Sequence, residues 1–187
     1  MRKIIISNLS SLDGFLAGPK GEIDWFAWND EMAQYSKGLI GSIDMIMFGR
    51  VTYELMASYW PTAGPTTDEP VIIEAMNNLP KIVFSRTLEK AAWKNTTLVK
   101  EARKEDILEM KRRPGKDIVI YGSGSLVSQF TDWGLIDDYR IFVNPVILAD
   151  GKPHFKGLKD MVKLDLLEAK AFYSGVVLLH YQPASAK

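Results

Sequence analysis

Small and basic residues follow three apolar segments of the sequence, in places where a parallel sheet would hold an anion. Residues 122–126 read Gly-Ser-Gly-Ser-Leu and come directly after the apolar run 118–121. Glycines let a bulky anion approach the backbone, and the start of a helix offers unpaired N–H groups with a favourable dipole. The stretch therefore predicts a phosphate site, with an ordinary turn as the competing interpretation.

The other two stretches add arginine to the same pattern. Gly49-Arg50 with Thr52 follows the mostly apolar segment 44–48, and Ser85-Arg86 follows the mostly apolar segment 81–84. The planar guanidinium matches the oxygens of a phosphate, and ligands of parallel sheets bind outside the carboxyl ends of the strands. One extended dinucleotide could thus contact all three stretches. The alternatives are exposed surface charges for the arginines and helix caps for the serines.

Three familiar sequence motifs do not account for residues 122–126. A P-loop needs Lys and then Ser or Thr after its last glycine, but Leu126 follows Ser125. The dinucleotide fingerprint lacks its third glycine, because Val127 stands there. A hydrolase elbow needs serine where Gly124 stands.

Strands and helices alternate along the first three quarters of the chain. Strands are predicted at 3–9, 44–48, 81–86, 96–100, 118–121, 140–143, 161–172 and 175–182. Helices are predicted at 30–40, 51–58, 71–78, 104–113 and from the glycine turn to about 133. This order predicts an α/β fold with a mostly parallel eight-stranded sheet, helices on both faces and a C-terminal antiparallel hairpin that turns at 173–175.

We expect one domain over 1–183 and a frayed tail at 184–187. Residues 10–28 and 60–70 are predicted to be loops, and the first, with its glycines and aromatics, a functional one.

The composition excludes several kinds of site and partner. The 187 residues include 23 basic and 23 acidic ones, so the net charge is zero, which argues against a nucleic-acid or membrane-surface binder. There is no cysteine, which excludes disulfides and thiolate metal sites, and two separated histidines predict no metal centre. No apolar run reaches the ~20 residues of a membrane span. The sequence therefore predicts a cytoplasmic protein, and this composition leaves small phosphorylated ligands possible.

Four stretches in this order resemble the dihydrofolate reductase fold. They read SLDGFLAG, FGRVTYELM, IVFSRTL and IYGSGSLVSQFTDWGLIDDYRIFVNPVILADG. They are more closely similar to the reductase domain of the riboflavin-biosynthesis deaminase-reductase and its stand-alone bacterial relatives. The resemblance covers about 3–153, and the last hairpin matches in architecture only. It implies a three-layer fold and an NADPH-dependent reductase of a small heterocycle.

The resemblance also assigns cofactor-binding residues. The adenosine ribose and its 2′-phosphate would contact Gly49, Arg50, Thr52, Ser85 and Arg86. The pyrophosphate would contact Gly122, Ser123, Gly124, Ser125 and Leu126, and the nicotinamide would lie by Ala17 and Gly18. Two arginines at the adenosine end predict at least ~10-fold tighter binding of NADPH than of NADH. Relatives are often homodimers, and 135–148 is the candidate contact segment.

Candidate catalytic and substrate-binding residues come from the loop and the first helix. Asp13 could orient the substrate or transfer a proton, or simply shape a turn. Glu31, or Asp30 if it does not cap the helix, could bind an aminopyrimidine ring. Substrate stacking on aromatic rings is expected at Trp25, Tyr53 and Trp60, with core packing as the alternative.

The sequence leaves three functions possible. The first is reduction of 5-amino-6-(5-phosphoribosylamino)uracil, the second reduction of dihydrofolate or another pterin, and the third a non-catalytic NADPH-binding module or sensor.

Overall fold

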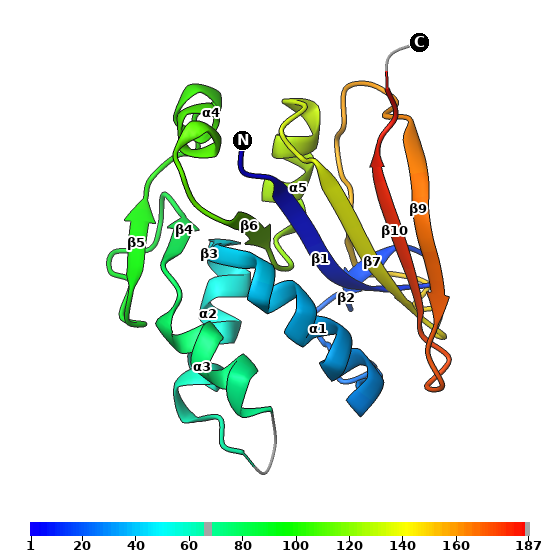
Figure 1. The fold of residues 1–187 in the computed structure, drawn as a ribbon. Coiled ribbons are helices and arrows are strands. Elements are labelled where there is room, and N and C mark those ends of the chain that lie inside the picture. Colours follow the sequence, from blue (N-terminus) through cyan, green and yellow to red (C-terminus); the bar gives the residue numbers. More distant parts are fainter. Residues whose placement is uncertain (66–68, 186–187) are drawn as a thin grey trace.

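One eight-stranded sheet forms the centre of the protein. The structure, a computed structural model, describes residues 1–65 and 69–185. The strand order is β5-β4-β3-β6-β1-β7-β10-β9 (Figure 1). The strands are β1 (Ile4–Ser11), β3 (Ile43–Gly49), β4 (Lys81–Phe84), β5 (Thr96–Val99), β6 (Asp117–Ile120), β7 (Asp138–Asn144), β9 (Leu164–Ala171) and β10 (Val177–Pro183).

The pairing is parallel from β5 to β7, whereas β10 runs antiparallel to β7 and to β9. The predicted mostly parallel sheet with a C-terminal antiparallel hairpin is therefore confirmed. A separate two-stranded sheet joins β2 (Phe15–Ala17) to β8 (Lys152–Pro153), and it was not predicted, because both strands are too short to show a period in the sequence.

Apolar side chains on the two faces of β1 pack against a layer of helices on each face of the sheet. Ile4 and Ile6 belong to one core cluster and Ile5 to another, because successive side chains of a strand point to opposite faces. The first cluster includes residues of α4 (Lys104–Arg112) and α5 (Gly124–Asp132). The second includes residues of α1 (Asp30–Ser42), α2 (Arg50–Tyr59) and α3 (Pro70–Asn78). The three-layer arrangement follows directly from these two clusters.

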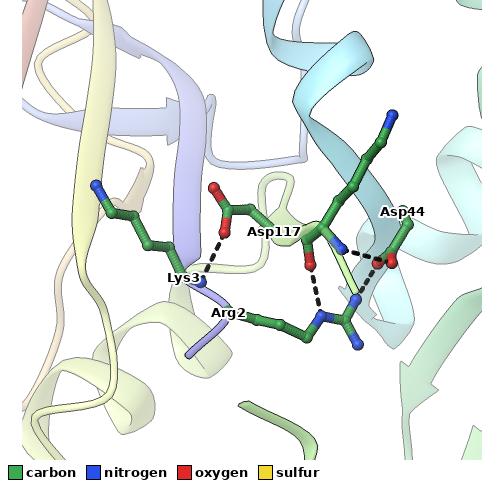
Figure 2. Close-up of polar contacts among 5 residues, drawn as sticks. Arg2, Lys3, Asp44 and Asp117 are labelled. Atoms are coloured by element: carbon green, nitrogen blue, oxygen red, sulfur yellow. Dashed lines mark hydrogen bonds and ion pairs between the residues drawn. The ribbon is translucent and has the colours of Figure 1, made fainter. Parts of the chain in front are cut away.

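A polar cluster holds the amino ends of β1, β3 and β6 together (Figure 2). The Arg2 side chain is buried, donates to Lys116 O at 2.5 Å and forms an ion pair with Asp44. Asp44 also accepts from Lys116 N at 2.8 Å, and Asp117 accepts from Lys3 N at 2.8 Å. These contacts fix the relative positions of the central strands at the end opposite to the three predicted phosphate stretches.

The predicted loop at 60–70 begins with a short 3-10 helix (Trp60–Thr62), and its residues 66–68 lie outside the described residues. The predicted frayed tail likewise lies partly outside them, at 186–187. No helix within 1–65 and 69–185 is both long and apolar enough to cross a bilayer.

Candidate cofactor site

The carboxyl ends of four neighbouring strands converge on the glycine turn. In the sheet register, Ile6 of β1 pairs with Ile120 of β6, and Met47 of β3 pairs with the same Ile120 on its other side. Gly49 of β3 pairs with Phe84 of β4. This edge of the sheet therefore holds, in order, Asn8, Gly122, Gly49 and Ser85. The three predicted phosphate-binding stretches are thus brought together.

The turn itself uses an unusual backbone. Gly122 and Ser123 both adopt left-handed conformations, with φ of +56° and +60°. A Cβ added to Gly122 would lie 2.6 Å from Thr52 Oγ1, and one added to Gly124 would lie 2.8 Å from Pro153 O. Glycine is thus required at both positions, because the protein's own atoms leave no room for a side chain.

Hydrogen bonds from β3 and α2 hold Ser123. Thr52 Oγ1 accepts from Ser123 N at 3.0 Å, and Ser123 Oγ accepts from Gly49 N at 2.8 Å and donates to Tyr121 O at 3.0 Å. The predicted residues Gly49, Thr52 and Ser123 therefore form one bonded unit. Ser123 and Thr52 shape the turn through these bonds, and the direct ligand contact that the resemblance implies stays a prediction.

Helix α5 begins directly at this turn. In the described chain no side chain caps this helix. Its first N–H groups, those of Gly124, Ser125 and Leu126, have no acceptor inside the helix. Such groups and the helix dipole favour an anion, so the donor set fits a pyrophosphate.

Both predicted phosphate-binding arginines already have carboxylate partners. Arg50 Nη1 lies 2.8 Å from Glu54 Oε2 one turn along α2, and Arg86 pairs with Glu101 beyond β5. The Arg86 side chain is 74% exposed and that of Glu101 55%. Exposed pairs of this kind are weak, so a phosphate can replace either carboxylate at low cost. Ser85 is buried, and its Oγ accepts from Leu88 N at 2.9 Å and so shapes the loop after β4.

The segment 15–18 lies against the glycine turn. Ala17 of β2 pairs with Lys152 of β8, and a Leu16 methyl lies 3.2 Å from the position of an added Gly124 Cβ. Gly18 N donates to Glu22 O at 2.9 Å, which closes a tight turn. The predicted nicotinamide segment therefore borders the predicted pyrophosphate turn.

Asp13 orders the neighbouring loops. Its carboxylate accepts from Ser11 Oγ at 2.7 Å, Ala149 N at 2.8 Å and Leu148 N at 3.1 Å. The hydrogen bond from Ser11, followed by those from the two backbone groups, lowers the pKa of Asp13. The carboxylate is therefore ionised near neutral pH, which suits the turn interpretation and makes it a poor proton donor. Its catalytic role stays a prediction.

Asn29, at the start of α1, accepts from Met32 N at 2.9 Å, so it caps the helix and Asp30 does not. Glu31 contacts the C-terminal hairpin. Its carboxylate accepts from Tyr173 N at 3.2 Å and lies 3.4 Å from Lys170 Nζ. Its predicted catalytic role also stays a prediction, and these contacts do not favour it.

The three predicted stacking aromatics pack within the protein. Tyr53 is buried, and its hydroxyl accepts from Trp93 N at 2.9 Å. Trp60 is half-buried and packs against the core cluster that includes Tyr53. Trp25 meets Phe26 edge-on and donates from Nε1 to the backbone of the 18–22 turn. Burial favours the packing interpretation for Tyr53, while substrate contact at Trp25 and Trp60 stays a prediction.

Sequence reasoning missed two residues that touch the turn, Asn8 and His154. Asn8 bonds both the backbone N–H and the backbone carbonyl of Gly122, and His154 contacts the Asn8 amide. Asn8 is a polar residue inside an apolar strand, which was a usable signal. His154 becomes relevant only through β8, whose position the sequence does not reveal.

Comparison with known proteins identifies the family. The model of the RibD C-terminal domain matches residues 2–178. The chain belongs to the RibD C-terminal domain family. The Bacillus subtilis (strain 168) uncharacterized protein YyaP is 33% identical over 180 residues, which are 96% of this chain and 94% of YyaP.

Two solved structures show the same fold as this RibD-type domain. A Shewanella sp. PV-4 protein provisionally assigned to riboflavin biosynthesis has a TM-score of 0.78 at 21% identity, over 99% of this chain and 100% of that one. The Enterococcus faecalis dihydrofolate reductase complexed with NADP(H) has a TM-score of 0.64 at 14% identity, over 98% and 97%. The predicted dihydrofolate reductase-like fold and family are confirmed. Membership of this family supports a reductase-like function.

Proposed function

We propose that this protein is an NADPH-dependent reductase of a small heterocycle, acting on 5-amino-6-(5-phosphoribosylamino)uracil or a close analogue. The observation that carries the proposal is the uncapped N-terminus of α5 behind the Gly122–Gly124 turn, with Arg50 and Arg86 at the next strand ends. This arrangement supplies backbone donors for a pyrophosphate and two cations for a 2′-phosphate.

The protein's own contribution is binding and orientation. Gly124, Ser125 and Leu126 would hold the pyrophosphate, Arg50 and Arg86 the 2′-phosphate, and Ala17 and Gly18 would border the nicotinamide. NADPH, when bound, supplies a hydride. The ribose-derived carbon of the substrate would accept that hydride, and a proton would complete its reduction. The β2–β8 sheet beside the turn would exclude water from this step.

Glu31 bears on the choice of substrate. A pterin reductase would use an acidic residue of the first helix to bind the aminopyrimidine, but the Glu31 carboxylate contacts Lys170 and Tyr173 N. These contacts count against Glu31 in that role, whereas Asp30, which does not cap α1, stays a candidate for it. The net charge of zero supports a small-molecule substrate in place of a nucleic acid.

The test is NADPH oxidation, followed by the loss of its near-ultraviolet absorbance, with aminopyrimidine riboside phosphates and pterins as acceptors. We expect turnover with the aminopyrimidine riboside phosphate. Turnover with dihydrofolate alone would show that dihydrofolate, and not the aminopyrimidine riboside phosphate, is the substrate. Tight NADPH binding without any turnover would favour a sensor.

We further propose a homodimer, because one face of the C-terminal strands is apolar and, beyond the buried Tyr139, only partly covered. In Figure 1, β10 and β9 lie at the right-hand end of the sheet, and no helix is drawn over them. All residues of β9 except Lys170 are exposed. On the face that includes Leu166, the paired positions of β7, β10 and β9 hold only apolar or tyrosine side chains. They are the rows Val143–Val177–Ala171, Ile141–Leu179–Ala169 and Tyr139–Tyr181–Leu166.

A second copy suits this face because self-association buries no charge there. Single proteins rarely expose a contiguous apolar patch of more than a few hundred Å². Two such sheets pack face to face at ~10 Å. Light scattering should give twice the chain mass for the native protein and a monomer for Leu179→Glu. Asp165→Lys, on the opposite face of β9, should stay dimeric, and a monomeric native protein would refute the dimer.

A further inference from the structure

Asn8 and His154 form a buried pair next to the glycine turn. Their exposed fractions are 2% and 3%. Asn8 Oδ1 accepts from Gly122 N at 2.6 Å, Asn8 Nδ2 donates to Gly122 O at 3.0 Å, and Nδ2 lies 3.0 Å from His154 Nε2. One side chain thus contacts both polar groups of Gly122 and also the imidazole.

These partners fix the direction of every hydrogen bond in the pair. A backbone N–H can only donate and a carbonyl can only accept, so Gly122 determines which end of the Asn8 amide is oxygen. Nδ2 then has one remaining N–H, and His154 Nε2 must accept it. An accepting Nε2 requires a neutral imidazole with its proton on Nδ1. Burial supports this state, because it lowers the pKa of His154 to about 4.

The pair also joins the two halves of the site. His154 follows β8, and its backbone N donates to Gly14 O at 2.9 Å, in the loop that leads into β2. The carbonyl groups of Pro153 and His154 border Gly124 at the start of α5. The contacts therefore run from the 14–17 segment through His154 and Asn8 to Gly122.

We propose that Asn8 and His154 are positioning residues, which hold the Gly122 peptide in its left-handed conformation and thereby aim the first N–H groups of α5 at the cofactor's pyrophosphate. This inference rests on the proposed function for its ligand, but the geometry of the turn can be tested without any ligand. Neither side chain needs to contact NADPH, so their effect passes through the backbone of residues 122–124.

The test compares four variants. Asn8→Leu removes all three hydrogen bonds at similar volume, and His154→Leu removes only the acceptor. His154→Gln is the conservative variant, because its Oε1 can accept in place of Nε2. Asn77→Leu is the matched control, since Asn77 Nδ2 donates to Trp60 O and Ile73 O and its Oδ1 accepts from Trp93 Nε1, away from the turn.

Two measurements are made on each variant: amide hydrogen exchange at Gly122 and Ser123, and the dissociation constant of NADPH. We expect faster exchange and about tenfold weaker NADPH binding in Asn8→Leu and His154→Leu, since each leaves a buried polar group without a partner. His154→Gln should stay within about threefold of the native affinity. Asn77→Leu should lower the stability of the protein without changing amide exchange at the turn or the affinity for NADPH.

Unchanged exchange at Gly122 in both leucine variants would overturn the inference. Faster exchange with native NADPH affinity would also overturn it, because the turn would then not depend on the pair for binding. If the native protein does not bind NADPH, the proposed function is wrong, while the exchange data still decide whether the pair holds the turn. If Asn8→Leu does not fold, the comparison of His154→Leu with His154→Gln decides.

Discussion

Replacing Arg86 by alanine should separate NADPH from NADH. Arg86 is placed at the carboxyl end of β4, one strand away from the Gly49 stretch, and its side chain is 74% exposed. The two cofactors differ only in the 2′-phosphate, so an arginine that binds this group affects NADPH alone. We expect weaker NADPH binding and nearly unchanged NADH binding in Arg86→Ala.

The magnitude follows from the Glu101 contact. A hydrogen bond to a charged group contributes about 1.5–3 kcal/mol, whereas an exposed ion pair contributes about 0–1 kcal/mol. Arg86 must exchange its Glu101 partner for the phosphate, so the net gain is about 1–2 kcal/mol. This corresponds to about 5- to 30-fold in affinity. By the same reasoning, Glu101→Gln frees Arg86 and tightens NADPH binding by up to about fivefold.

Calorimetric titration of both cofactors into each variant measures these changes. Arg113→Ala is the matched control, because Arg113 forms a similarly exposed pair with Glu109 on α4. It should leave both affinities unchanged. Equal losses for NADPH and NADH in Arg86→Ala, or no loss for either, would refute the role of Arg86 at the 2′-phosphate.

Three further changes have defined outcomes. Gly122→Ala should destabilise the fold by about 1–3 kcal/mol and abolish cofactor binding, because it adds a Cβ close to Thr52 at a positive φ; native-like urea unfolding would contradict this. Lowering the pH should reduce stability from about pH 6.5 toward pH 4, by up to about 3 kcal/mol. In this window the unfolded chain protonates His154 and the folded chain does not, so His154→Gln should lose this part of the pH dependence in urea titrations. Arg2→Ala should lower the melting temperature by removing the contacts to Asp44 and Lys116, without changing NADPH affinity, and a changed affinity would argue against the separation of the two sheet ends.

The sheet and its helices could be predicted because their signals are local. Apolar runs such as 118–121 and the turn at 173–175 identify strands and the hairpin without knowledge of distant residues. The bounds were less certain: β1 continues to Ser11 and β7 begins at Asp138, because polar residues in these strands are paired or buried. The β2–β8 sheet depends on contact between residues more than a hundred positions apart, which no local pattern shows.

The part of the candidate site that sequence alone can suggest is the part where residue type indicates the chemistry. Glycines and arginines at strand ends indicate phosphate binding, and the structure brings Gly49, Thr52 and Ser123 into one bonded unit. Further hydrogen bonds to the turn come from Asn8, which His154 contacts, and their role depends on register and burial. The sequence likewise does not show that Glu31 contacts the C-terminal hairpin, since this contact joins residues 31 and 173.

A nuclear magnetic resonance titration with NADPH tests the central claim most directly. If the glycine turn binds the pyrophosphate, the N–H resonances of Gly124, Ser125 and Leu126 should shift strongly and saturate at a cofactor concentration below ~1 mM. Resonances near Arg2 and Asp44, at the opposite end of the sheet, should not move. Saturable binding that leaves the Gly124–Leu126 resonances unchanged, or no binding at all, would contradict the account.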